Sequence, residues 1–184
     1  MSNFDNTNNE FDIDLLGFFD LINQTAKRKK FDTMLAQEII KAKNTISYVS
    51  LLLVEIDYFK NYLDTYGHQA RASCLQQVAF SLESSFKRAG DLVTRWGDSQ
   101  FICLLTDTDF IGAEKMGERL RKAIMALNIP HVDSPVAKIV TVSIGSVSTI
   151  LTDDTSCDEL ITKVEQALSH AIEMGRNQFI NWEK

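Results

Sequence analysis

The sequence has 184 residues, of which 45% are hydrophobic and 24% are charged, with only 2 prolines and 8 glycines. This composition excludes a disordered, collagen-like or repetitive chain, and it favours one compact domain whose core needs neither disulfides nor a structural metal. The 19 basic and 25 acidic residues give a net charge of −6, which argues against extended nucleic-acid binding because such binding requires a basic surface.

The N-terminus and the cysteines indicate the compartment. No stretch approaches the ~20 apolar residues of a membrane span, and the acidic start MSNFDNTNNEFDID is unlike a signal peptide. The cysteines are Cys74, Cys103 and Cys157; their odd number and wide spacing are typical of buried thiols in a reducing environment. We therefore expect a cytoplasmic protein without a membrane span.

The chain divides into three parts. Residues 1–10 are rich in Asn and Asp and are expected to form a disordered tail. Over residues 11–43, apolar side chains recur at helical spacing, which predicts an N-terminal helical segment of two helices, joined near residues 23–28, that leads into the domain. The remaining elements lie in residues 44–184, which are expected to form the domain itself.

This domain is expected to contain strands and helices around one central strand. The central strand is the almost wholly apolar run YVSLLLVEI at 48–56, since both faces of such a strand are buried. Two short strands joined by residues 97–100 predict a hairpin, because Gly and Asp tolerate positive φ. The other predicted strands are 91–96, 101–105, 139–147 and 178–182, and the predicted helices are 58–65, 71–87, 111–127 and 156–173. A hairpin among helices indicates an α/β (α+β) fold, with a mixed sheet covered on both sides.

Six short motifs follow one another along the chain. They are DLINQTAKRKKF at 20–31, EIDYFK at 55–60, DTYGH at 64–68, RWGDSQF at 95–101, VSIG at 142–145 and GRN at 175–177. In this order and spacing, the chain resembles the GGDEF family, the diguanylate cyclases that condense two GTP molecules into cyclic di-GMP. The resemblance implies a ferredoxin-like, nucleotide-cyclase-type fold with a central mixed, mainly antiparallel sheet flanked by helices and an extra N-terminal helix.

The family's reaction needs two divalent ions held by carboxylates, and most of those positions are changed here. By the resemblance, the first metal carboxylate falls on Glu55, the second on Ser99, and the Glu that follows falls on Gln100. A hydroxyl and an amide do not replace two anionic ligands, so no residue of the signature is expected to act in catalysis: Gly97, Asp98, Ser99 or Gln100. Glu55 remains as a metal ligand. Asp98 could be a second ligand if the signature is aligned one residue further along, but that shift would move Phe101 to the opposite face of its strand.

Guanine recognition is also expected to be lost. The family's base-reading Asn and Asp fall on Leu63 and Ala72, which offer no hydrogen-bonding group to a base edge. For the phosphates, the resemblance leaves Arg176 together with Phe59 and Lys60, which lie at a predicted helix start where backbone N–H groups bind anions. The alternative is that Phe59 packs in the core and Lys60 is solvated.

A second family site is better preserved. The family binds its product at an R-x-x-D motif before the signature strand, together with an Arg from the following helix, and these positions fall on Arg88, Asp91 and Arg119. Arginine binds guanine edges and phosphates bidentately, and an aspartate accepts hydrogen bonds from guanine. The alternative is an ordinary i, i+3 ion pair at a helix end that Gly90 terminates.

These residues predict a degenerate GGDEF domain that acts as a cyclic di-GMP receptor or regulatory module. It requires no cofactor, and it requires Mg²⁺ only if cyclase activity remains. The alternatives are a residual diguanylate cyclase that uses Glu55 and Asp98, and a protein-interaction module that binds no nucleotide. The expected partners are cyclic di-GMP and a second GGDEF protein, in a homodimer or a heterodimer, and no nucleic acid is expected to bind.

Overall fold

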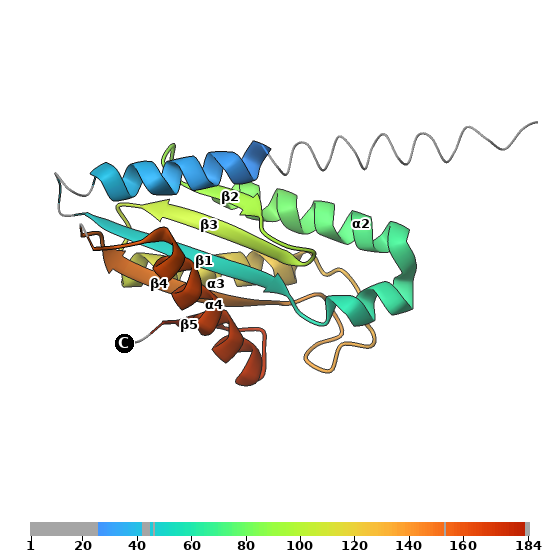
Figure 1. The fold of residues 1–184 in the computed structure, drawn as a ribbon. Coiled ribbons are helices and arrows are strands. Elements are labelled where there is room, and N and C mark those ends of the chain that lie inside the picture. The colour runs from blue at the N-terminus through green and yellow to red at the C-terminus, as the bar shows by residue number, and fades with distance from the viewer. Residues whose placement is uncertain (1–25, 42–44, 46, 153, 183–184) are drawn as a thin grey trace, which may run out of the picture.

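The centre of the molecule is a five-stranded sheet with the strand order β2-β3-β1-β4-β5 (Figure 1). The computed structural model describes residues 26–41, 45, 47–152 and 154–182. The strands are β1 (Tyr48–Ile56), β2 (Leu92–Arg95), β3 (Gln100–Thr106), β4 (Val142–Ile150) and β5 (Phe179–Asn181). β1 pairs antiparallel with β3 and β4, whereas β5 pairs parallel with β4. This arrangement confirms the expected mixed, mainly antiparallel sheet.

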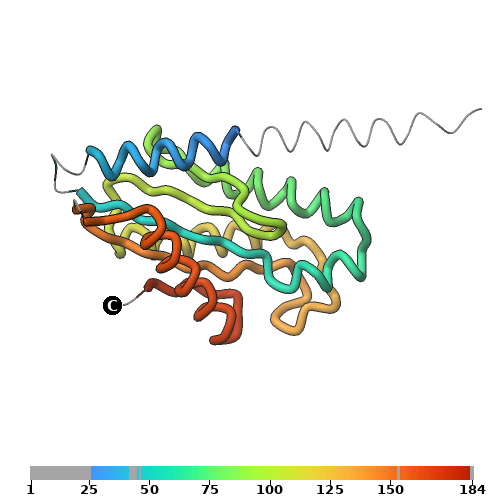
Figure 2. Tube along the Cα trace, in the orientation of Figure 1, coloured from blue at the N-terminus to red at the C-terminus, as the bar shows by residue number. Residues whose placement is uncertain are grey.

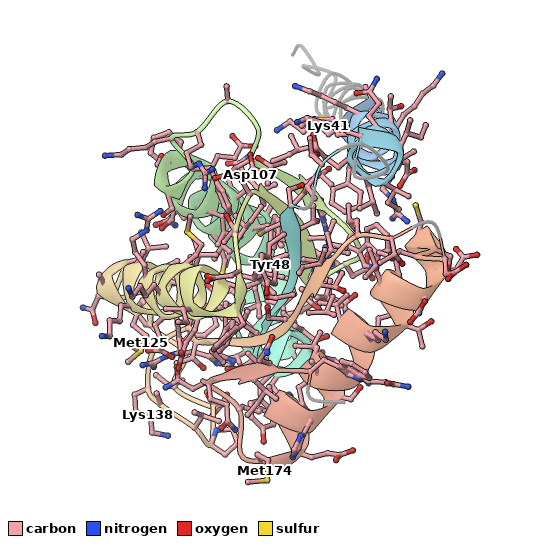
Figure 3. All side chains as sticks on the ribbon, turned by 90° about the vertical axis from the view of Figure 1, so that its left-hand side faces the viewer. Lys41, Tyr48, Asp107, Met125, Lys138 and Met174 are labelled. Carbon is pink, nitrogen blue, oxygen red and sulfur yellow. The ribbon has the colours of Figure 1, made fainter. Side chains whose placement is uncertain are left out.

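Helices cover both faces of the sheet. They are α2 (Phe59–Ser85), α3 (Phe110–Ala126), α4 (Cys157–Glu173) and a helix over residues 26–41, called the N-terminal helix here. Seen along the strands, α2 and α3 lie on one side of the sheet, and the N-terminal helix and α4 lie on the other (Figure 3). Because side chains alternate along a strand, Leu52 and Val54 of β1 join the core under α2 and α3, whereas Leu51 and Leu53 join the second core.

The N-terminal helix is packed against the sheet. Its side chains Phe31 and Leu35 are buried in the second core. Phe31 also makes an edge contact with the ring of Trp96, with 5.8 Å between the ring centroids, and the Arg28 guanidinium lies 3.1 Å from the centroid of the same indole. These contacts connect the N-terminal helix to the hairpin that follows β2. The expectations for residues 1–25 fall outside the described residues.

The helix that follows β1 contains a kink. Hydrogen bonding continues from Phe59 to Ser85, but Gly67 inside this range has φ 80° and ψ 177°, which are not helical values. Glycine adopts positive φ without the steric cost that a side chain imposes. The two helices predicted at 58–65 and 71–87 are therefore the two arms of α2, visible as a sharp bend in Figure 1.

The strand predicted at residues 139–147 is observed as β4, which begins and ends three residues further along the chain. β4 extends to Ile150 because Ser148, Thr149 and Ile150 pair with the start of β1, although Ser148 and Thr149 are polar. At the other end, Ile139 forms only an isolated bridge with Pro130. Pairing with the full length of β1 thus sets the bounds of β4.

The three cysteines have free thiols. Cys74 and Cys103 are buried, and Cys157 is half-buried. Burial raises the pKa of the Cys74 thiol to about 12, so this thiol stays protonated at neutral pH and packs as a small apolar side chain. Within the described part of the chain, we find no helix with the length and hydrophobicity that a membrane crossing requires.

Candidate functional site

Two sites of the sequence analysis lie at opposite ends of the sheet. The signature hairpin, the start of α2 and the loop over residues 127–141 gather at one end (Figure 2). Figure 3 faces the other end, where Tyr48 begins β1 and Asp107 follows β3. At a rise of about 3.3 Å per residue, the length of β1 separates the two ends by roughly 25 Å. A ligand at one end therefore does not contact the residues of the other.

At the hairpin end, the carboxylate expected to hold a metal is already hydrogen-bonded. Glu55 and Gln100 are register partners on β1 and β3, which brings their side chains together. The Gln100 amide nitrogen donates to a carboxylate oxygen of Glu55 at 2.5 Å. An amide at this distance neutralises no charge, but it occupies one of the lone pairs that a cation would use.

The hairpin itself is held by a side chain. The guanidinium of Arg95 donates to the carbonyl oxygens of Gly97 and Asp98 at 3.0 and 2.9 Å. Neither Gly97 nor Asp98 has a positive φ, so the reason given for the predicted turn was wrong, although the hairpin forms. This loop is closed without a left-handed backbone, by the hydrogen bonds from Arg95 and by the backbone N–H groups of Trp96 and Gly97, which donate to the carbonyl oxygen of Gln100.

The other signature residues make contacts of their own. The Asp98 side chain is 97% exposed, and its ion-pair partner is Arg71 at 3.9 Å. Ser99 contributes its carbonyl oxygen to the backbone N–H of Ile56. Phe101 is buried and pairs with Val54, so the two side chains share one face of the sheet. Among the residues that the structure describes, no three His, Cys, Asp or Glu side chains are grouped closely enough to hold a metal ion.

A buried carboxylate that the sequence analysis did not single out lies next to this hairpin. Asp57 is fully buried. Its two oxygens accept hydrogen bonds from Thr141 Oγ1 at 2.7 Å, from Ser143 Oγ at 2.6 Å and from the backbone N–H of Asn177 at 3.1 Å. Asp57 thus joins the end of β1 to β4 and to the turn that carries Arg176. With both oxygens used inside the protein, it has a structural role.

The residues left for phosphate binding are only partly brought together. The Arg176 guanidinium lies 4.3 Å from the ring centroid of Tyr58, the residue that caps the start of α2. Phe59 is buried, whereas Lys60 is exposed, as in the alternative interpretation of these two residues. A phosphate at the start of α2 would therefore meet Arg176 and backbone N–H groups, with Lys60 at the periphery.

At the opposite end of the sheet, Arg88, Asp91 and Arg119 come together. Arg88 and Asp91 line one surface cavity of about 490 Å³. Arg119 donates to the carbonyl oxygen of Ser85, the last residue of α2, at 2.6 Å. Arg88 donates to Thr108 Oγ1 at 3.1 Å, and Asp91 accepts from the backbone N–H of Thr106 at 3.2 Å. Each charged group is thus oriented by a hydrogen bond to the scaffold.

These charges do not form the ordinary helix-end ion pair. α2 ends at Ser85, so Arg88 lies beyond the helix and Gly90 does not terminate it. A Cβ at Gly90 would lie 2.3 Å from Thr106 Oγ1, which shows that Gly90 is required by a close approach to β3. None of the ion pairs found among the described residues joins Asp91 to either arginine.

The environment of Asp91 shows how closely the three charges act on one another. Burial raises the pKa of the Asp91 carboxyl, whereas the Thr106 N–H and the positive charges of Arg88 and Arg119 lower it, with burial the larger effect. Both arginines are therefore close enough to influence the carboxyl. An anionic ligand that binds the arginines would also meet this carboxyl, which is suited to accept hydrogen bonds from N–H groups.

The sheet topology, the hairpin and the flanking helices define a nucleotide-cyclase-type α/β domain. A model of the family described as "Diguanylate cyclase, GGDEF domain" matches residues 18–178. The chain belongs to this family.

Relatives of known name support the same assignment. The chain is 35% identical over 130 residues to diguanylate cyclase A of Treponema denticola, covering 71% of this chain and 34% of that protein. It is 37% identical over 131 residues to diguanylate cyclase DgcM of Escherichia coli K12, covering 71% of this chain and 30% of that protein. The chain thus spans about a third of the length of these relatives.

A solved structure shows the same fold. The GGDEF domain of DgcB from Caulobacter crescentus, in complex with c-di-GMP, superimposes with a TM-score of 0.75 at 21% identity, covering 85% of this chain and 91% of that chain. At this identity the likeness concerns the fold, and it agrees with the sheet and helix layers described above.

Proposed function

We propose that this chain is a catalytically degenerate GGDEF domain that binds cyclic di-GMP through Arg88, Asp91 and Arg119 and acts as a receptor or regulatory module. The observation that carries the proposal is the convergence of these three charges on one surface without an ion pair between them. The guanidinium groups retain donors for guanine edges and phosphates, and the Asp91 carboxylate accepts from guanine N–H groups. The DgcB domain, which shares this fold, was solved with c-di-GMP.

The loss of catalysis is supported by the opposite end of the sheet. The Gln100 amide holds the Glu55 carboxylate, and Ser99 supplies no anionic oxygen where the family has its second metal carboxylate. A domain that binds the product but does not make it transmits a signal only through a partner. We therefore propose a second GGDEF domain as that partner, either another copy or an active cyclase, in the cytoplasm.

Replacing Arg88 by alanine should weaken cyclic di-GMP binding by about 2 kcal/mol, roughly 30-fold in Kd, because a bidentate charged contact is lost. Isothermal titration calorimetry of the two proteins measures this difference. Lys87→Ala is the matched control, since it removes a neighbouring positive charge that lies outside the cavity, and it should change Kd by less than about threefold. Equal affinities for the wild type and Arg88→Ala would refute the site.

The same binding should depend on pH through Asp91. Because burial raises the pKa of this carboxyl, it becomes protonated at a higher pH than an ordinary Asp. Protonation removes an acceptor, so affinity should be complete at neutral pH and should fall as the pH drops through the raised pKa. Titrations between pH 4 and 7 should show this fall in the wild type and a flatter profile in Asp91→Asn. A wild-type affinity that stays constant over this range would show that Asp91 does not accept from the ligand.

Residual diguanylate cyclase activity is the second candidate function, because the named relatives are diguanylate cyclases and Glu55 keeps a carboxylate. With GTP and either Mg²⁺ or Mn²⁺, we expect chromatography to detect no cyclic di-GMP formed by the purified chain. Product formation would replace the receptor proposal with this one. If there is neither turnover nor heat of binding with cyclic di-GMP, the domain is a nucleotide-free interaction module.

A further inference from the structure

A surface groove of about 700 Å³ follows the outer edge of β5, the last strand in the order of the sheet. We call it the β5 groove. It is lined by β5 together with Phe110 and Glu114 of α3 and Ala167 of α4, whereas β4, which the structure describes in full, contributes no residue. Figure 3 shows α3 and α4 on opposite sides of the sheet. The groove therefore has the free edge of β5 as its floor and one helix on each side.

Part of the β5 backbone faces this groove. The carbonyl oxygen of Gln178 accepts a hydrogen bond from β4 at 2.9 Å, and the N–H of Trp182 donates to β4 at 2.6 Å. In a parallel pair, every second residue of a strand bonds to a given neighbour, and the residues between them face the other way. Phe179 and Asn181 thus direct their N–H and C=O groups away from β4 and toward the groove.

The sequence does not protect this edge against further pairing. The edges of natural sheets are commonly blocked by charged side chains or by proline. Residues 178–182, with the sequence QFINW, contain no charged residue and no proline. Phe179, Ile180 and Asn181 are each only half-buried. β5 is therefore accessible to a further strand.

Side chains of β5 alternate between the two walls of the groove. Phe179 packs on α3, where a Cβ at Gly117 would lie 2.2 Å from its Cδ2 atom. Trp182 packs on the core at the other side of the sheet, and its indole N–H donates to Gln166 Oε1 of α4 at 3.1 Å. A compact ligand on one face would not reach the other, whereas a strand along the edge reaches both with alternate side chains.

The two walls differ in chemistry. On the α4 side, Ala167, Ile180 and Trp182 present a mainly apolar surface. On the α3 side, the ring of Phe110 is 54% exposed, and Glu114 follows it one helical turn later. An added strand would therefore meet apolar groups on one face, and an aromatic ring beside a carboxylate on the other.

Glu114 gives the β5 groove its charge. It is the only Asp, Glu, Lys or Arg side chain that lines the groove. Within the described part of the chain, none of the ion pairs includes it. A nearby cation, Lys163, lies 4.5 Å from the ring centroid of Trp182 and already pairs with Glu159. A basic side chain in the added strand would therefore meet an available carboxylate.

We propose that the β5 groove binds an extended segment of a partner protein, which adds a sixth strand to the sheet. The backbone of this segment pairs with the N–H and C=O groups of Phe179 and Asn181, as in other complexes formed by strand addition. Its apolar side chains pack toward α4, and the basic side chains that alternate with them face Glu114. None of the three residues proposed to bind cyclic di-GMP lines the groove, so this proposal is independent of that site.

A second copy of the chain fits the groove less well than an extended segment. Paired strands lie about 4.8 Å apart, and β5 of a second copy lies on the floor of the same groove, between its own α3 and α4. The helices of the two copies would meet before the two β5 strands reached this distance. In addition, two identical grooves both carry a negative charge.

The test uses the peptide acetyl-Lys-Val-Lys-Val-Lys-amide and its analogue with glutamate in place of lysine, in calorimetric titrations of the full chain. We expect the lysine peptide to bind at least about 10-fold more tightly, because only its side chains pair with Glu114. Glu114→Gln should weaken the lysine peptide about 3-fold. Glu165→Gln is the matched control, since it makes the same change of charge on an exposed part of α4 outside the groove, and it should leave Kd unchanged.

Backbone pairing is tested by removing N–H groups from each partner. Asn181→Pro removes an N–H that points into the groove and does not bond to β4, so Tm should fall by less than about 3 °C, while the lysine peptide binds at least about 10-fold more weakly. Asn181→Thr keeps this N–H and should retain binding. In the peptide, backbone N-methylation of all lysines or of all valines should abolish binding in only one of the two cases, because alternate residues face β5.

A preference for the lysine peptide, together with loss of binding in Asn181→Pro and not in Asn181→Thr, supports the proposal. Absence of binding at about 1 mM peptide, equal affinity for the lysine and glutamate peptides, equal affinity for the two methylated peptides, or unchanged affinity in Glu114→Gln and Asn181→Pro would each overturn it. A dimer of the full chain in sedimentation that Asn181→Pro dissociates would also overturn it, since a second copy would then fill the groove. Arg88→Ala should leave peptide binding unchanged, so failure of one site is distinguishable from failure of the other.

Discussion

Replacing Asp57 by alanine should lower the free energy of unfolding by about 3 to 4 kcal/mol. The carboxylate is fully buried and accepts hydrogen bonds from Thr141, Ser143 and the backbone of Asn177. Without it, two buried hydroxyls and a backbone N–H lose their acceptor, and hydrogen bonds to a charged group contribute about 1.5 to 3 kcal/mol each. Urea unfolding measures the change, and the m-value should stay the same if the loss is confined to the folded state.

Two further variants separate this network from a general charge effect. Asp57→Asn keeps the shape and one carbonyl oxygen, so it should cost about half as much as Asp57→Ala. Asp64→Ala removes a carboxylate from the exposed surface of α2 and should change the free energy of unfolding by less than about 0.5 kcal/mol. If Asp57→Ala is no more destabilising than Asp64→Ala, the network does not hold β1 to β4.

The sheet and its helices could be predicted from the sequence because their signals are local. The apolar run of β1 and the helical periodicities of α3 and α4 each fall within one segment, so the five strands and three helices were found with small shifts of their ends. The end of β4 was missed because it depends on pairing with β1, about 100 residues away along the chain. The hairpin was found for an incorrect reason, since its loop has no positive φ at Gly97 or Asp98 and is closed by hydrogen bonds from Arg95 and from the backbone to Gln100.

The chemistry of the candidate site is a prediction from the sequence, whereas its contacts come from the structure. The types of side chain at single positions such as Ser99 and Ala72 were evident from the sequence. The hydrogen bond between Gln100 and Glu55 was not, because it depends on the register of β1 against β3.

The second large effect is expected at the Glu55–Gln100 pair. Gln100→Glu should lower the free energy of unfolding by about 3 kcal/mol at pH 7 without divalent cations, because two carboxylates would meet where a hydrogen bond at 2.5 Å exists now. This repulsion raises the pKa of one carboxyl in the folded state. The Gln100→Glu variant should therefore recover its stability as the pH falls below the usual range of Glu. Its stability should decrease again as the pH rises through the raised pKa.

Divalent cations should reverse this destabilisation, which makes the variant a test of whether the amide of Gln100 keeps cations from Glu55 in the wild type. A cation that binds the two carboxylates binds only the folded state, so adding Mg²⁺ or Ca²⁺ should raise the Tm of Gln100→Glu by several degrees. Gln100→Met is the matched control: it removes the amide without adding charge, so it should be destabilised but should not respond to the cations. The wild type should not respond either, because its amide already holds Glu55. A wild-type Tm that rises with Mg²⁺ as much as that of Gln100→Glu would show that Glu55 binds a cation despite the amide, and the case for residual cyclase chemistry would be reopened.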